Sequence, residues 1–136
     1  MNILLDTHIF LWAAEENSRL SPKVRAILKT HDRTIFFSAI SSLEISIKWS
    51  KGILELPEPP PSFVTSILAA SGISQLPVTV LDACAVAELP LHHKDPFDRV
   101  LVAQARTNGL QLMTADPMLA KYDVDIIALW DNKDDE

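Results

Sequence analysis

The sequence alternates short apolar runs with longer segments of helical periodicity, and this alternation limits the possible folds more than any other feature. The apolar runs predict strands at residues 2–5, 34–37, 76–80, 111–113 and 125–128. The periodic segments predict helices at residues 8–16, 22–30, 39–51, 61–71, 82–88, 96–108 and 117–121. Strands that alternate with helices are typical of βαβ units. We therefore predict the α/β class, with a central, mostly parallel, five-stranded sheet flanked by helices on both faces.

The chain has the length and composition of one globular domain. Of its 136 residues, 48% are hydrophobic and 22% are charged, which is ordinary for a chain that buries a core. We expect a single domain over residues 1–130 and a disordered acidic tail over residues 131–136. The only cysteine, Cys84, lies among small apolar residues, so we expect an inert, buried thiol and a cytoplasmic protein. No apolar stretch approaches the roughly 20 residues that cross a bilayer, and we expect neither secretion nor membrane insertion.

The negative charge of the chain argues at first against nucleic acid binding. The net charge is −6 and the pI is near 5.1, whereas non-specific affinity for phosphates depends on Lys and Arg. Part of the excess lies in the acidic tail. Another part would be neutralised if the remaining acids formed one site for a divalent cation.

Two of these acids directly follow predicted strands. Asp6 comes after the strand at residues 2–5, and Asp116 comes shortly after the strand at residues 111–113. The carboxyl ends of parallel strands are where ligands bind in open α/β sheets. Each acid taken alone is also explained as the N-cap of the helix that follows it.

Glu44 lies on a helix and within an apolar stripe. Ile40, Leu43 and Ile47 are spaced to share one helix face, and Glu44 falls inside that stripe. A buried carboxylate is unfavourable unless it is paired, hydrogen-bonded or bound to metal. An ion pair with Lys48, four residues on, is the structural alternative. Such a pair contributes only a few tenths of a kcal/mol, which does not explain burying the acid, so we favour a functional role.

Asp95 and Asp98 both belong to the first turn of the helix that starts with Pro96. Acids at that place interact favourably with the helix dipole and need no other purpose. We expect Asp95 to be the N-cap. Taken together, acids at three strand-to-helix junctions and one acid on a helix could converge on one cleft. Oxygen ligands without clustered His or Cys suit Mg²⁺ or Mn²⁺ better than zinc.

The motifs that carry these acids resemble those of the PIN-domain nucleases, and more narrowly of the VapC-type toxins of toxin–antitoxin pairs. The matching segments extend over nearly the whole chain: Leu4-Leu5-Asp6-Thr7-His8, Leu43-Glu44-Ile45 with Ile47-Lys48, His93-Lys94-Asp95-Pro96-Phe97-Asp98-Arg99, and Thr114-Ala115-Asp116. The resemblance implies a PIN-like fold. It also implies that the acids form a catalytic metal site, in which Asp6, Glu44 and Asp98 hold the metal and Asp116 completes the pocket through water.

The resemblance leaves several neighbouring residues with open roles. It implies that the hydroxyls of Thr7 and Thr114 support the ligands. For His8 and His93 we favour a hydrogen bond to nearby backbone or carboxylate over direct catalysis. Arg99 and Lys48 would either contact a phosphate or pair with the surrounding acids.

The function implied is metal-assisted hydrolysis of RNA phosphodiester bonds by an endoribonuclease, with a VapB-like antitoxin and a second copy of the chain as partners. The apolar residues Ile9 to Trp12, together with Trp49, could line such partner surfaces, although their spacing predicts that most of them pack in the core. One alternative is a non-catalytic PIN-like module that binds RNA or protein. Another is a phosphatase of the haloacid-dehalogenase type, which we disfavour because that family needs a second aspartate where this chain has His8.

Overall fold

The protein forms a five-stranded, entirely parallel sheet, as seen in a computed structural model that describes residues 1–130. The predicted acidic tail, residues 131–136, lies outside the described residues. The strand order is β3-β2-β1-β4-β5. The strands are β1 (Ile3–Leu5), β2 (Ile35–Ser38), β3 (Ser74–Leu76), β4 (Gln111–Thr114) and β5 (Ile126–Ala128). The predicted α/β class and five-stranded sheet are confirmed.

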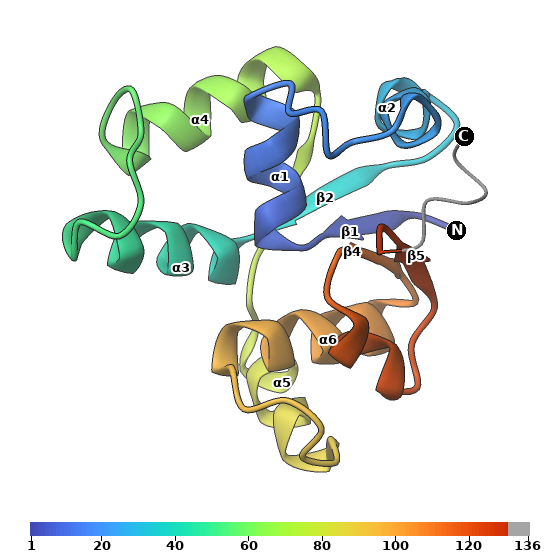
Figure 1. The fold of residues 1–136 in the computed structure, drawn as a ribbon. Coiled ribbons are helices and arrows are strands. Elements are labelled where there is room, and N and C mark those ends of the chain that lie inside the picture. The colour runs from blue at the N-terminus through green and yellow to red at the C-terminus, as the bar shows by residue number, and fades with distance from the viewer. Residues whose placement is uncertain (131–136) are drawn as a thin grey trace.

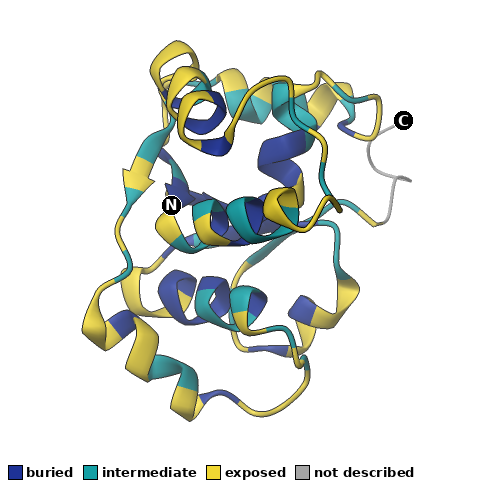
Figure 2. Ribbon diagram, turned by 90° about the vertical axis from the view of Figure 1, so that its left-hand side faces the viewer, coloured by how far each residue is buried: buried dark blue, intermediate teal, exposed yellow. Residues whose placement is uncertain are grey.

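Helices cover both faces of the sheet (Figure 1). On one side lie α1 (Thr7–Ala14), α2 (Pro22–Lys29), α3 (Ala39–Ser50) and α4 (Pro60–Ser71). On the other side lie α5 (Val80–Cys84), η1 (Ala85–Glu88), α6 (Pro96–Asn108) and η2 (Pro117–Lys121). Figure 2 shows that buried residues line the inner faces of these helices and the sheet between them.

The central position of β1 explains why the sequence of this strand is an unbroken apolar run. Ile3 and Leu5 pack into the core on one side of the sheet, and Leu4 packs into the core on the other. Successive side chains of a strand point to opposite faces, so a strand covered on both faces is apolar throughout. All three side chains are fully buried.

The topology creates a crevice at the carboxyl end of β1. The chain adds β2 and β3 on one side of β1, and then crosses over to place β4 and β5 on the other side. Ligands bind at such a reversal, outside the carboxyl ends of the strands, because the connecting segments leave in opposite directions there. Asp6 comes directly after β1.

The predicted N-caps are confirmed by their hydrogen bonds. Ser21 Oγ accepts from the amide of Val24 at 3.2 Å. The carboxylates of Asp95 and Asp116 each accept from the amide two residues on, at 2.9 and 3.0 Å. Asp95 and Asp116 therefore have a structural role whatever else they do.

The predicted strand at residues 76–80 is wrong, because β3 ends at Leu76 and Val80 begins α5. Pro77 has no N–H to extend the strand ladder. Thr79 and Asp82 form a capping box at the start of α5, in which Thr79 Oγ1 accepts from the Asp82 amide and Asp82 Oδ2 accepts from the Thr79 amide, both at 3.1 Å.

The prediction of a buried Cys84 is also wrong, because the residue is exposed. It lies at the end of α5, a short helix at the surface where Val80 and Leu81 are also largely exposed. Of the apolar residues considered for partner surfaces, Ile9, Phe10 and Leu11 are in the core, while Trp49 is 39% exposed. Within residues 1–130, no helix has the length and apolar character needed to cross a membrane.

A buried polar network joins α6 to the loop between β3 and α5. Gln104 is fully buried, and its Nε2 donates to the Pro77 carbonyl at 3.0 Å and to Asp82 Oδ2 at 3.2 Å. Its Oε1 accepts from the hydroxyl of Ser38, the last residue of β2. Because buried polar groups are costly when unpaired, each member of this network depends on the others.

Replacing Gln104 with leucine should destabilise the protein by roughly 2–3 kcal/mol, because it leaves the buried groups of Ser38 and Asp82 without their partner. Urea unfolding measures the change. Gln75→Leu, on an exposed position of β3, is the matched control and should change stability by less than about 0.5 kcal/mol. Equal effects of the two substitutions would show that the network contributes nothing.

Asp82 should make the free energy of unfolding depend on pH in the acid range. Burial by itself raises the pKa of Asp82, but hydrogen bonds from Thr79 and Gln104 together lower it below the ordinary 3.8. A carboxyl with a lowered folded-state pKa stabilises the protein above its unfolded-state value, and this contribution disappears as the pH falls through the folded-state value. Asp82→Asn should therefore lower the free energy of unfolding by roughly 1 kcal/mol at pH 7. The gap to the wild type should close below about pH 3.8, as urea unfolding across that range would show.

Candidate metal centre

The structure brings the four predicted carboxylates to one place at the carboxyl edge of the sheet. Asp6 follows β1, Glu44 lies in α3, Asp98 lies in the first turn of α6, and Asp116 follows β4. The charges of Asp6, Glu44 and Asp116 all raise the pKa of Asp98, so these side chains face a common space. Asp6, Glu44 and Asp98 are buried. Segments up to 110 positions apart in the chain thus meet at the crevice beside β1.

Glu44 is buried, as the sequence predicted. Leu43, part of the expected apolar stripe, is 49% exposed. The buried residues of α3 are instead Ser41, Glu44 and Ile45. The stripe prediction is therefore wrong at Leu43, because the buried side of α3 carries Ser41 and Glu44 beside the core residue Ile45.

Glu44 uses only one of its carboxylate oxygens within the described part of the chain. Oε2 accepts from Lys48 Nζ at 2.6 Å, so the alternative ion pair does form. Oε1 is buried and has no hydrogen-bond partner among residues 1–130. The hydrogen bond to Glu44 raises the pKa of Lys48, and the charges of Asp95 and Asp98 add to that effect. Lys48 is therefore a fixed cation at the rim of the centre.

Asp6 also uses only one of its two carboxylate oxygens for a hydrogen bond within the described residues. Its Oδ2 accepts from Thr114 Oγ1 at 2.6 Å, while Oδ1 is buried without a partner among the described residues. Burial raises the pKa of Asp6, and the negative charge of Glu44 raises it further against the opposing effects of Thr114 and His8. The carboxylate is thus oriented at one oxygen and free to bind at the other.

The ionised form of Asp98 is strongly disfavoured in the metal-free centre. Burial raises its pKa to about 8, and the nearby charges of Asp6, Asp95, Glu44 and Asp116 contribute. A divalent cation would remove this repulsion, and it would also supply a partner for the buried oxygens of Asp6 and Glu44. The residues therefore fit a hard cation with oxygen ligands such as Mg²⁺ or Mn²⁺.

Asp116 is the most accessible of the four carboxylates, with 33% of its side chain exposed. Its Oδ1 caps η2 by accepting from the Met118 amide, and its Oδ2 lies 2.9 Å from His93 Nε2. The same nitrogen lies 3.3 Å from Asp98 Oδ2. The sequence favoured a hydrogen bond from His93 to backbone or carboxylate, and the ring contacts both. Its contacts with two of the four acids were not predicted.

The remaining predicted residues have mixed positions. Thr114 contacts Asp6 as expected, whereas the Thr7 hydroxyl donates to Ser41 Oγ at 2.8 Å. His8 is exposed, and its ring centre lies 6.3 Å from that of Trp12.

Arg99 forms several hydrogen bonds within the described part of the chain. Its guanidinium donates to the backbone carbonyls of Pro90 and Val86, at 3.0 and 3.2 Å, and to the hydroxyl of Tyr122 at 3.2 Å. These hydrogen bonds hold the loop before α6, while a phosphate contact or an ion pair with the acids stays a prediction for Arg99. Tyr122 was not found by sequence reasoning, since its partners lie more than 20 positions away and no local pattern indicates them.

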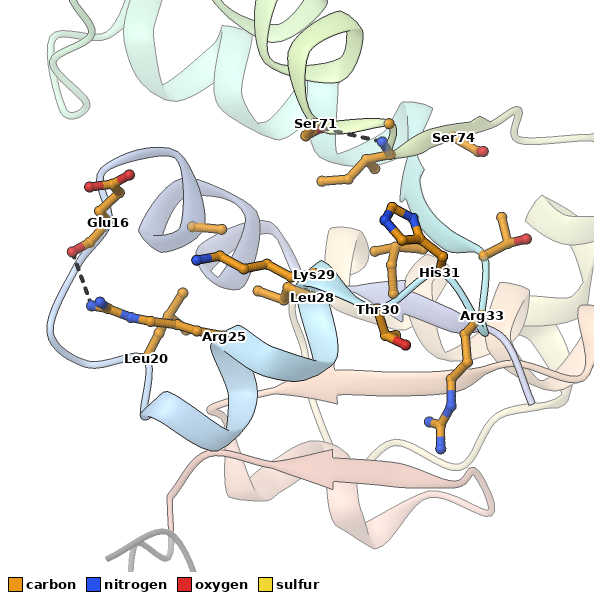
Figure 3. Close-up of a pocket in the computed structure, with 15 residues that line it drawn as sticks. Glu16, Leu20, Arg25, Leu28, Lys29, Thr30, His31, Arg33, Ser71 and Ser74 are labelled. Atoms are coloured by element: carbon orange, nitrogen blue, oxygen red, sulfur yellow. Dashed lines mark hydrogen bonds between the residues drawn. The ribbon is translucent and has the colours of Figure 1, made fainter.

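The cavities agree with a site beside Glu44. A small cavity of about 170 Å³ is lined by residues that include Thr7, Glu44 and Lys48. A larger one of about 680 Å³ lies at the opposite edge of the sheet, beside the start of β2 and β3 (Figure 3). Its arginines have other partners: Arg25 donates to the carbonyls of Glu16 and Asn17, and Arg33 donates to Gln111. Of these two cavities, the smaller one has one of the four carboxylates, Glu44, in its lining, and the larger one has none of them.

The chain belongs to the PIN domain family, whose sequence model matches residues 3–125. Solved structures share its fold. VapBC2 from Rickettsia felis, bound to a DNA fragment from its promoter, has a TM-score of 0.73 at 17% identity and covers 94% of this chain and 98% of its own. FitAcB from Neisseria gonorrhoeae has a TM-score of 0.65 at 20% identity, with 94% and 98% covered. DNA-bound VapBC from Salmonella typhimurium has a TM-score of 0.67 at 15% identity, with 95% and 98% covered. No curated protein sequence matches the chain.

Asp98→Asn should stabilise the metal-free protein, and more so at high pH. Because the folded-state pKa of Asp98 is about 8 and the ordinary value is 3.8, the folded protein binds the extra proton, and the wild type loses stability as the pH rises between these values. In chelator at pH 9 the variant should be more stable by roughly 1–2 kcal/mol, and the gap should shrink toward pH 5. Denaturant unfolding at both values measures it. A pH-independent gap would contradict the electrostatic account.

Proposed function

We propose that this PIN domain is a Mg²⁺- or Mn²⁺-dependent endoribonuclease and the toxin of a toxin–antitoxin pair. The observation that carries the proposal is the pair of buried oxygens, Asp6 Oδ1 and Glu44 Oε1, that lack partners among residues 1–130. They belong to a cluster of acids that repel one another. A divalent cation would stabilise such a cluster, and metal-assisted phosphodiester hydrolysis needs a cation held in this way.

The proposed role of each acid follows from how far its side chain is buried. Asp6, Glu44 and Asp98 are the buried acids and would hold the ion. The ion, when bound, offsets the charge that develops on the phosphate and lowers the pKa of water. Asp116 is exposed enough to contact solvent, so it would orient the attacking water and accept its proton at a carboxylate oxygen. Lys48, fixed on Glu44, would balance part of the charge of the acids.

The acidic net charge is compatible with an RNA substrate on this assignment. Four of the 18 acidic residues lie in the centre, where a cation and Lys48 would compensate them, and four more lie in residues 131–136. The remaining surface is therefore closer to neutral than the value of −6 suggests.

The proposed partners are a VapB-like antitoxin and a second copy of the chain. The similar structures described above are named as VapBC and FitAcB complexes. In this chain, Leu43, Trp49 and Ile53 are 49%, 39% and 70% exposed along α3 and just after it. These exposed apolar side chains could contribute to such a contact surface.

Asp6→Asn should reduce RNA cleavage by at least about 100-fold in saturating Mn²⁺. One carboxylate oxygen of Asp6 orients the side chain and the other would bind the ion, and the substitution turns one of them into an amide nitrogen. Total RNA incubated with pure protein, followed by sequencing of the new ends, measures cleavage and its position. Asp123→Asn, at an exposed acid, is the matched control and should cleave like the wild type. A chelator should abolish cleavage by both active proteins.

The alternative of a non-catalytic PIN-like module predicts a different result. If this alternative were right, the wild type would not cleave RNA, and calorimetry would find no binding of Mg²⁺ or Mn²⁺. Cleavage that persists in Asp6→Asn at wild-type rates would refute the metal-centre mechanism itself. Membership of the PIN family replaces the phosphatase alternative, which the sequence already disfavoured at His8.

A further inference from the structure

The imidazole of His93 has both ring nitrogens engaged. Nδ1 accepts a hydrogen bond from the Asp95 amide at 3.0 Å. Nε2 lies 2.9 Å from Asp116 Oδ2 and 3.3 Å from Asp98 Oδ2. The ligating atoms of these three residues lie within 4.8 Å of one another, which is close enough for all three to hold one ion. Distance alone therefore leaves open whether His93 is a ligand or a support.

The hydrogen bond at Nδ1 decides between these roles. A backbone amide can only donate, so Nδ1 is the acceptor and carries no proton. The proton of the neutral ring is then on Nε2, where it is donated to the carboxylates of Asp116 and Asp98. The one lone pair in the plane of the ring faces the Asp95 amide, and none faces the acids. In this arrangement His93 can neither ligate an ion at the centre nor accept a proton there.

The backbone around His93 is held just as firmly. Its amide donates to the Tyr122 hydroxyl at 2.9 Å. Arg99 Nη1 donates to the same hydroxyl at 3.2 Å and to the Pro90 carbonyl at 3.0 Å. Because Arg99 follows Asp98 directly in α6, the helix that presents one carboxylate also fixes the loop that carries His93. The support thus connects the residue that follows η2, α6 and the loop between η1 and α6.

We propose that His93 is a positioning residue that holds Asp98 and Asp116 in register through its Nε2 proton, with Tyr122 and Arg99 fixing its loop. The inference rests on the proposed function of the acids as a metal centre. Two carboxylates that repel each other separate unless something between them donates to both. Hydrogen-bonded residues behind metal ligands typically change metal affinity or activity 10–100-fold when removed.

Two substitutions at position 93 separate the donor from the ring. His93→Leu removes the donor and should weaken Mn²⁺ binding, measured by calorimetry, about 10–100-fold with a comparable loss of kcat/KM. His93→Gln can place an amide N–H near the Nε2 position and should recover Mn²⁺ affinity to within roughly 5-fold of the wild type. His31→Leu, at an exposed histidine beside the distant cavity, is the control and should bind Mn²⁺ normally. Thermal unfolding of each variant checks that it folds.

A spectroscopic measurement tests the role without activity. In electron spin echo spectra of the Mn²⁺-loaded wild type, we expect no nitrogen coupling of the size that a directly bound imidazole gives. A strong coupling that disappears in His93→Leu would show that His93 is a ligand and would overturn the inference. Unchanged Mn²⁺ affinity and kcat/KM in His93→Leu would overturn it as well.

A double substitution tests the path through Tyr122. Tyr122→Phe removes the hydroxyl that His93 and Arg99 share, so it should weaken Mn²⁺ binding by a smaller factor than His93→Leu does. In the His93→Leu background it should have almost no further effect, because residues that act through one another are not additive. Fully additive effects would contradict the path. Asp6→Asn, measured in the same assays, separates failure of this inference from failure of the proposed function. If the proposed function is right and His93 is passive, Asp6→Asn loses Mn²⁺ binding and cleavage, whereas the variants of His93 and Tyr122 keep both.

Discussion

The mutual repulsion of buried carboxylates is the interaction on which the rest of this structure depends. Burial and neighbouring negative charges both disfavour the ionised form of Asp98, and the same two effects act on Asp6. A fold does not gain stability from such a cluster by itself. The acids are therefore best explained by what they bind, and the surrounding hydrogen bonds by the need to keep them together.

The parallel sheet makes this arrangement possible. Its two apolar cores hold β1 rigidly from both faces, and the reversal of strand order opens a crevice where Asp6 leaves the sheet. Rigid strands and helices position side chains more precisely than loops do. The loop that carries His93 is tied down by Arg99 and Tyr122. The buried network around Gln104 similarly anchors α6, which presents Asp98.

Sequence reasoning succeeded where a signal was local. Strand runs, N-caps at Ser21, Asp95 and Asp116, and the α/β class follow from patterns a few residues long. It failed where neighbours from elsewhere decide the outcome. The strand expected at residues 76–80 is cut short by Pro77 and the capping box that follows it. On α3, Leu43 matched an apolar stripe but is exposed, whereas Ser41, Glu44 and Ile45 are the buried residues.

The sequence alone determined the element order, the parallel sheet and the four candidate acids, because hydrophobic periodicity and the chemistry of each side chain are properties of the chain itself. Only the tertiary structure decided that these acids share one space, that Glu44 and Asp6 each keep one unpartnered oxygen among the described residues, and that His93 lies between two of them. The reason is physical. Electrostatic and hydrogen-bonding interactions act over a few ångströms in space, and distance along the chain does not report that separation.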